Sequence, residues 1–194
     1  MQALKAQIQP HFIFNSLNTI YDRVLSQDLE TPKQIIYLSN FLRYTVQEAS
    51  EDFILLEKEV WFIESYISLV MNRHGERVTA SFTQEGYLGN YKIPPLLLIT
   101  YVENAFKHGV EATSLDAWVQ IYLRMEKNGL FVFSIKNSHP CISSKGTGQG
   151  LANAKRRLAL LFPQKHSLII ESNASIFNIT LTILLSTYEN SETL

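Results

Sequence analysis

The chain has 194 residues, 46% of them hydrophobic, and its 17 basic and 18 acidic side chains leave a formal net charge of -1. A chain of this size can bury a sizeable core in one or two domains. The balanced charge gives no overall attraction for nucleic acid or an anionic membrane, and no local basic patch supplies one. The single cysteine, Cys141, excludes a disulfide within the chain and fits a reducing compartment.

No apolar stretch reaches the roughly 18 to 20 residues that span a bilayer. The stretch over residues 92–109 is interrupted by Glu103 and Asn104. The N-terminus also lacks the basic flank and apolar core of a secretory signal. We therefore expect the chain to be soluble.

Helical patterns fill the first part of the chain. Apolar residues at helical intervals predict one helix from about residue 4 to 26 and a second from 32 to 47. The second helix carries more apolar positions than one partner helix can cover, and a short helical hairpin is not stable alone. We therefore expect residues 1–50 to form a hairpin that pairs with a second copy into a four-helix bundle.

Helical and extended patterns alternate in the rest of the chain. The expected elements are a helix over 56–73 ended by Gly75, a strand over 78–82, a helix over 93–109 opened by Pro94 and Pro95, two strands within 118–137 joined by Lys127-Asn128-Gly129, a helix over 150–161 stopped by Pro163, and strands over 166–173 and 175–185. The Asn-Gly pair is the clearest hairpin signal. This order predicts an α+β fold, in which an α/β sandwich with a mixed, mostly antiparallel sheet covered on one face by helices follows the hairpin.

A glycine-rich segment at 145–158, KGTGQGLANAKRRL, places Gly146, Gly148 and Gly150 just before a predicted helix. Glycine lets the backbone approach a ligand closely, and a helix N-terminus attracts anions, so the segment indicates a phosphate site. An ordinary glycine-rich turn is the alternative, because the segment has the pattern of neither a P-loop nor a dinucleotide-binding turn.

The segment VENAFKHG at 102–109 places Asn104, Lys107 and His108 at positions i, i+3 and i+4 of a predicted helix, on one face. An amide oxygen beside a cation suits a hydrated Mg²⁺ next to phosphates, since this ion needs few protein ligands. The alternative is a solvated helix end, where Lys107 and His108 complement the helix dipole.

The segment QIQPHFIFNSLN at 7–18 sets His11 between a proline and a run of aromatic and apolar residues. A packed core histidine is one interpretation and a nucleophile is the other, because a neutral imidazole keeps a free nitrogen lone pair. Asn15 lies four residues on and shares the helix face of His11, where its amide can orient the ring or a water molecule.

Together these segments resemble the catalytic core of LytS/YehU-type bacterial sensor histidine kinases, whose ATP-binding domain is similar to those of the gyrase and MutL (GHKL) superfamily. The resemblance extends over residues 2–163, and PHFIFNSLN is its most specific part. It implies a dimerisation and phosphotransfer hairpin over 1–50, a Bergerat-type ATP-binding domain over 51–188 and a frayed tail over 189–194. It also implies a homodimer, no nucleic-acid partner, and a cytoplasmic fragment attached to the membrane only through a sensor region absent from this chain.

The implied activity is that of an ATP-dependent protein histidine kinase in a two-component system. His11 would accept the γ-phosphoryl group of ATP and pass it to an aspartate of a response-regulator receiver domain, and Asn15 would orient the ring or act in a phosphatase step. Asn104 would coordinate Mg²⁺. The residues implied to meet the nucleotide phosphates or to match the end of the glycine-rich loop are Lys107, His108, Gly146, Gly148, Gly150, Leu151, Asn153 and Arg157.

Three positions depart from the patterns of related ATPases and kinases. Asn137 stands where many members have an aspartate that reads the adenine amino group, and its carbonyl can accept the same hydrogen bond. Phe12 replaces the acidic proton acceptor of many histidine kinases, so the base stays open, with Glu103 as one candidate. Thr100 replaces a water-activating glutamate, which disfavours an ATP-driven clamp. A nucleotide-binding pseudokinase that signals by conformation is the alternative function.

Overall fold

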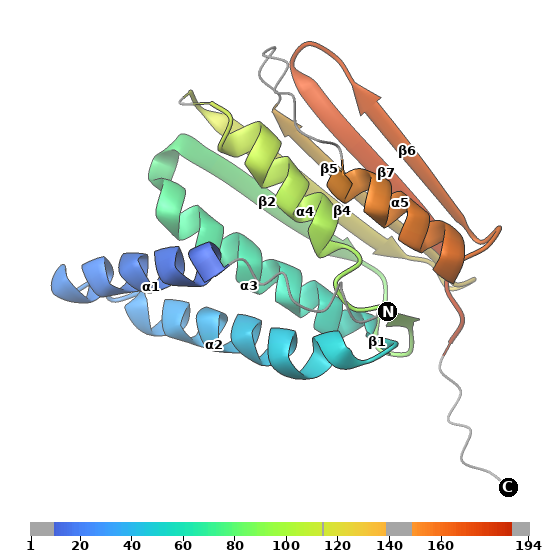
Figure 1. Cartoon of the computed structure of the whole chain (residues 1–194), viewed down its shortest axis with the longest axis horizontal. Coiled ribbons are helices and arrows are strands. Elements are labelled where there is room, and N and C mark those ends of the chain that lie inside the picture. Colours follow the sequence, from blue (N-terminus) through green and yellow to red (C-terminus); the bar gives the residue numbers. More distant parts are fainter. Residues whose placement is uncertain (1–9, 114, 139–148, 188–194) are drawn as a thin grey trace, which may run out of the picture.

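The structure, a computed structural model, describes residues 10–113, 115–138 and 149–187 (Figure 1). Helices gather on one face of a five-stranded sheet, and a helical hairpin lies beside them. Among the described helices, none is both long and apolar enough to cross a membrane.

The helical hairpin consists of α1 (Pro10–Leu25) and α2 (Thr31–Gln47), followed by the short η1 (Glu48–Ser50). Pro32 lies in the first turn of α2, where a missing N–H is tolerated. Both helices contact α3 (Leu56–His74), which also contacts the sheet. The hairpin therefore shares one hydrophobic cluster with the rest of the described chain, through Ile20, Leu38 and Phe41.

The main sheet has the strand order β2-β4-β5-β7-β6. Its strands are β2 (Val78–Glu85), β4 (Ala117–Met125), β5 (Leu130–Ser138), β6 (His166–Ser172) and β7 (Ile176–Leu184). The β2–β4 pair is parallel and the other three pairs are antiparallel. The predicted mixed, mostly antiparallel sheet is confirmed.

One face of the sheet forms the core. In β4, alternate residues from Ala117 to Met125 are buried, as expected for a strand with one face against helices. Figure 1 shows α3, α4 (Ile99–Ala105) and α5 (Gln149–Leu161) on this face. The hydrophobic residues of the two layers form a single cluster that includes Val102, Ile121 and Leu158.

The predicted turn between β4 and β5 is confirmed. Gly129 has a φ of 87°, which a side-chain-bearing residue rarely adopts. Asn128 supports the turn because its Oδ1 accepts a hydrogen bond from the backbone N–H of Leu130 at 2.9 Å. Gly75 likewise ends α3 with a φ of 60°, as its place in the sequence predicts.

The helix expected to open at Pro94 and Pro95 was placed too early. The α-helix begins at Ile99, and it changes at Phe106 into a π-helix, η3 (Phe106–Val110). Leu96 cannot belong to a regular helix because its φ is 58°, in the left-handed region.

Three short elements had no signal in the sequence. The strands β1 (Ile54–Leu55) and β3 (Lys92–Ile93) pair antiparallel, and η2 (Gly75–Arg77) follows α3. The expectations for residues 1–9 and for the tail over 189–194 lie outside the described residues.

Candidate active site

His11 is exposed at the start of α1, so a packed core position is excluded. Asn15, one turn further along the helix, brings its Nδ2 to 3.2 Å from Nδ1 of His11. The side-chain amide therefore reaches the imidazole, as the four-residue spacing predicts. The imidazole is both open to solvent and held by a neighbouring side chain.

Phe12 anchors the start of α1 to the core. Its ring lies 4.9 Å from the ring of Phe41 in α2 and 5.1 Å from the ring of Tyr66 in α3, measured between centroids. Because consecutive helical residues point in different directions, burial of Phe12 leaves His11 on the solvent side. Phe12, the apolar neighbour that suggested a buried histidine, therefore helps to keep His11 exposed.

Asn104, Lys107 and His108 lie across the change from α4 to the π-helix η3. Asn104 and His108 are half-buried, whereas Lys107 is exposed. The N–H of Glu111 closes the π turn by donating to the carbonyl of Phe106 at 2.9 Å. The π turn, a feature frequent at functional sites, replaces the regular helix expected here.

Glu103, which precedes Asn104, is an acidic residue whose pKa is raised by its surroundings. Burial raises the pKa of Glu103 to about 7, and Lys107 partly opposes that rise. A carboxyl group with a pKa near the working pH can both take up and release a proton.

Asn137 lies in β5 and is only 1% exposed. Its Nδ2 donates a hydrogen bond to the carbonyl of Ser138 at 2.8 Å, but its Oδ1 has no hydrogen-bond partner in the described part of the chain. A buried acceptor without a partner is costly, so this oxygen leaves a place for a further donor, such as a water molecule or a ligand. The amino group of adenine is such a donor.

Gly109 covers Asn137 directly. A Cβ atom at Gly109 would lie 2.4 Å from Nδ2 of Asn137 and 2.8 Å from the carbonyl oxygen of Ser138. Only glycine therefore lets the end of η3 approach the strand this closely.

The residues predicted from the glycine-rich loop separate into three groups. Gly146 and Gly148 lie outside the described residues. Gly150 and Asn153 are exposed in α5, whereas Leu151 is half-buried and packs against the core.

Arg157, the last residue of that prediction, points toward the turn before α4. Its Nη2 donates to the carbonyl of Pro95 at 2.7 Å, and its Nη1 donates to the carbonyl of Leu96 at 3.4 Å. Its contact with a nucleotide stays a prediction. In the described residues, no group of three or more His, Cys, Asp or Glu side chains is placed to hold a metal ion.

Comparison with known proteins decides the family. Residues 1–78 match the family model described as histidine kinase. The chain is 31% identical to the sensor protein LytS of Staphylococcus saprophyticus over 94% of its own length, and 31% identical to LytS of Bacillus subtilis over 89%. The chain belongs to the LytS-type histidine kinases. It spans about a third of the length of these relatives, 33% and 31% respectively.

Solved structures have the same fold as this chain. The histidine kinase AdeS of Acinetobacter baumannii has a TM-score of 0.50 at 14% identity and covers 85% of this chain and 83% of its own. The kinase domain of a blue-light-activated histidine kinase from Erythrobacter litoralis has a TM-score of 0.52 at 10% identity and covers 91% and 93%. The predicted α+β fold is confirmed.

Two features of the chain were not predicted from its sequence. Gly109 ends the segment VENAFKHG, and a glycine inside a helical pattern was the available signal for its close approach to Asn137. The second is Glu59, which lies among Leu56, Ile63 and Tyr66 on the buried side of α3. A carboxylate at the centre of an apolar stripe was the signal for a buried polar contact.

Proposed function

We propose that this chain is the catalytic core of a two-component sensor kinase, which uses ATP to phosphorylate His11. The observation that carries the proposal is the exposed imidazole of His11, with the amide of Asn15 3.2 Å from it, inside the region that matches histidine kinases. An exposed, oriented imidazole has a nitrogen lone pair available to a phosphoryl donor.

The nucleotide-binding part of the proposal rests on Asn137. Its buried and unpartnered Oδ1 fits the amino group of adenine, which donates a hydrogen bond that guanine cannot offer from the same place. The histidine kinase ShkA, with a TM-score of 0.51 and 14% identity to this chain, was solved in complex with AMPPNP. We assign the same class of ligand, an adenine nucleotide, to this chain.

The phosphates would extend from Asn137 along α4 and η3 toward the start of α5. Lys107 would neutralise phosphate charge, with His108 beside it, and the backbone amides around Gly146, Gly148 and Gly150 would wrap the chain of phosphates. Asn104 is the proposed protein ligand of Mg²⁺, whose other positions water and phosphate oxygens would fill. When bound, this ion would neutralise charge that develops on the transferred group.

The residues around His11 and the nucleotide mainly position the reacting groups, since phosphoryl transfer needs little covalent chemistry from the protein. Asn15, whose Nδ2 lies 3.2 Å from Nδ1 and 3.3 Å from Nε2 of His11, would restrain the ring while one of its nitrogens attacks the γ-phosphorus. A bond forms between that nitrogen and phosphorus while the bond to the ADP oxygen breaks. The imidazole then loses a proton, and the base that takes it is open, with Glu103 a candidate by its pKa of about 7.

The proposed partners follow from the hairpin and the phosphorylated histidine. The phosphoryl group would pass from His11 to an aspartate in the receiver domain of a response regulator. A second copy of the chain would cover exposed apolar side chains of α1 and α2, namely Phe14, Leu17, Tyr21, Val24, Ile35 and Ile36. The chain would lie in the cytoplasm and reach the membrane through a sensor region outside it.

Incubation with γ-labelled ATP and Mg²⁺ tests the proposal, with the His11→Gln variant as the control. We expect the wild-type chain alone to gain a label that survives alkali and is lost in acid, as a phosphoimidazole is. Label in both proteins would contradict the assignment of His11. Nucleotide binding without any label would favour the alternative of a nucleotide-binding scaffold.

A further inference from the structure

Glu59 is a fully buried carboxylate with three hydrogen-bond donors. Its Oε1 accepts from the backbone N–H of Leu98 at 2.9 Å, and its Oε2 accepts from the backbone N–H of Leu96 at 2.9 Å. The hydroxyl of Tyr44 donates to the same Oε2. Glu59 lies on α3 and Tyr44 on α2, while the two leucines belong to the turn that leads into α4.

The turn before α4 needs such support. Leu96 holds a φ of 58°, which is unfavourable for a residue with a side chain. The side chain of Leu98, the residue before α4, offers no capping hydrogen bond. From the other side, Arg157 of α5 donates to the carbonyls of Pro95 and Leu96. One acidic and one basic side chain therefore hold this turn by its N–H and carbonyl groups respectively.

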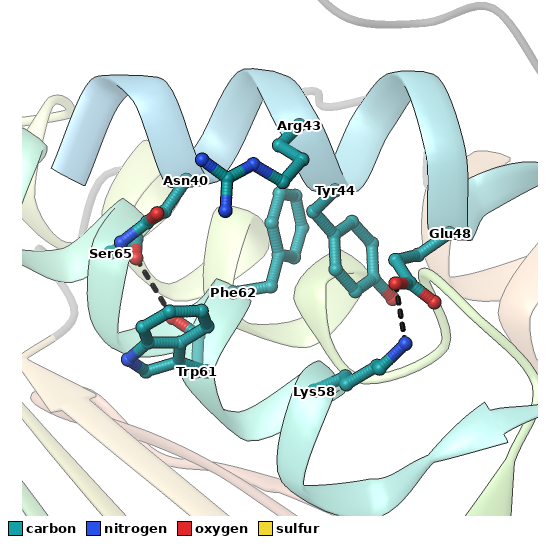
Figure 2. A pocket seen from close by; sticks show the side chains of 8 residues that line it. All are labelled: Asn40, Arg43, Tyr44, Glu48, Lys58, Trp61, Phe62 and Ser65. Carbon is teal, nitrogen blue, oxygen red and sulfur yellow. Dashed lines mark hydrogen bonds and ion pairs between the residues drawn. The ribbon is translucent and has the colours of Figure 1, made fainter. Parts of the chain in front are cut away.

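Tyr44 connects this turn to the helical hairpin. Its ring stacks on Phe62 with centroids 4.0 Å apart, and its hydroxyl also accepts the N–H of Leu96 at 3.2 Å. Figure 2 shows both rings in the wall of a pocket between α2 and α3, with a volume of about 230 Å³. The Lys58–Glu48 ion pair, 2.5 Å long, lies in the same wall. The ring of Tyr44 fills space between the helices, and its hydroxyl makes the polar link to Glu59 and Leu96.

We infer that Glu59 is a positioning residue for α4, and that Tyr44 ties this position to α2 of the hairpin that carries His11. The inference rests on the proposed function, in which α4 supplies Asn104 to the metal ion and nucleotide. Asn104 lies six residues after Leu98, about 9 Å along the helix, so a shift of the start of α4 at Leu98 is passed on to Asn104. The nucleotide helix and the phosphoacceptor hairpin thus meet at one buried carboxylate.

The pKa of Glu59 is raised, because the effect of burial outweighs the hydrogen bonds from Tyr44, Leu98 and Leu96 and the nearby charge of Arg157, which lower it. The two oxygens of a carboxyl group can accept all three hydrogen bonds, whereas an amide has only one oxygen. An amide in the same place would turn a donor toward one of the three donors. Glu59→Gln therefore removes part of the support with little change in volume.

Titration calorimetry of the whole chain with AMPPNP and Mg²⁺ tests this inference through two separate quantities, the Kd and the number of sites. The variants are Glu59→Gln and Tyr44→Phe, and the control is Tyr37→Phe, which removes a hydroxyl from a half-buried ring on the same helix. We expect the Kd to rise at least tenfold in Glu59→Gln and about fivefold in Tyr44→Phe. The control should stay within twofold of the wild-type chain.

The number of sites separates positioning from loss of fold. Partial unfolding lowers the number of sites at an unchanged Kd, whereas a displaced α4 raises the Kd at an unchanged number of sites. If Glu59→Gln does not fold, Tyr44→Phe decides alone, because its ring still packs on Phe62. If the wild-type chain binds the nucleotide and Tyr44→Phe binds it with the same Kd, the inference is contradicted and the proposed function is not. A wild-type chain that binds no nucleotide contradicts the proposed function as well.

Discussion

The ring of Phe12 stacks on the ring of Tyr66, with centroids 5.1 Å apart and planes inclined by 24°. Tyr66 also meets Phe106 edge-on, with centroids 5.9 Å apart and planes inclined by 77°. Phe12 follows His11 in α1, and Phe106 precedes Lys107 in η3. One tyrosine of α3 therefore contacts the neighbour of the proposed phosphoacceptor and the neighbour of the proposed phosphate-binding lysine.

Replacement of Tyr66 by alanine should strongly destabilise the chain. Tyr66 is 8% exposed and packs against Phe12, Phe41 and Phe106. Loss of a buried aromatic ring costs about 3–5 kcal/mol, and we expect the free energy of unfolding in urea to fall by this amount. Tyr66→Phe keeps the ring and should change it by less than about 1 kcal/mol. Equal stability of Tyr66→Ala and wild type would contradict this packing.

Because of Glu103, the free energy of unfolding should fall as the pH rises. Burial raises its pKa from 4.5 to about 7, so the folded chain holds this proton more tightly than the unfolded chain. The contribution of the protonated carboxyl is fully present below pH 4.5 and is lost as the pH rises through 7. Glu103→Gln, which stays neutral, should exceed the wild type in stability by about 2–3 kcal/mol at pH 8 and match it at pH 4.

Chemical denaturation at the two pH values measures this difference. The control is Glu57→Gln, which removes an exposed carboxylate from the first turn of α3. A gain in stability of Glu103→Gln that is the same at pH 4 and pH 8 would show that titration of Glu103 is not its cause.

Gly109→Ala should disturb Asn137, since the new Cβ would lie 2.4 Å from Nδ2 of that residue. We expect a loss of about 1–3 kcal/mol in the free energy of unfolding, typical of overpacking, and weaker binding of AMPPNP. Gly150→Ala is the matched control for stability, because a Cβ there meets no atom of the described residues within 4 Å. Thermal unfolding of both variants checks the contrast, and a stable Gly109→Ala chain with wild-type affinity would refute it.

Asn137→Leu should remove the preference for adenine. Leucine has a similar volume but lacks Oδ1, the buried acceptor that has no partner among the described residues. A buried hydrogen bond of this kind contributes about 1–2 kcal/mol, so the Kd for ATP should rise roughly tenfold. Competition between ATP and GTP for a fluorescent nucleotide measures the preference. Undiminished selectivity for ATP in the variant would place adenine recognition elsewhere.

Local patterns predicted most elements of the fold. The helical period of α2 and α3 and the Asn128-Gly129 turn are signals that neighbouring residues carry, and the structure confirms them. The start of α4 was wrong because tertiary hydrogen bonds decided it: Glu59 accepts the N–H groups of Leu96 and Leu98 from another helix. Pro94 and Pro95, which predicted the helix start, carry no information about that contact.

The part of the candidate site that depends on residues close in the sequence was predictable. The contact of Asn15 with His11 follows from helical spacing, whereas the exposure of His11 depends on the packing of Phe12 against α2 and α3. The burial of Asn137 under Gly109 does not follow from spacing either, since it depends on two segments that meet only in the folded chain. The direction of Arg157, toward carbonyls before α4, likewise arises from packing between elements.

The most direct test of the central claim is to locate the phosphoryl group by peptide mass spectrometry after incubation of the chain with ATP and Mg²⁺ at alkaline quench. The chain has five histidines, so the position is informative. We expect one added phosphoryl group on His11, in the peptide that contains PHFIFNSLN. Phosphorylation at His74, His108, His139 or His166 with none at His11 would contradict the account.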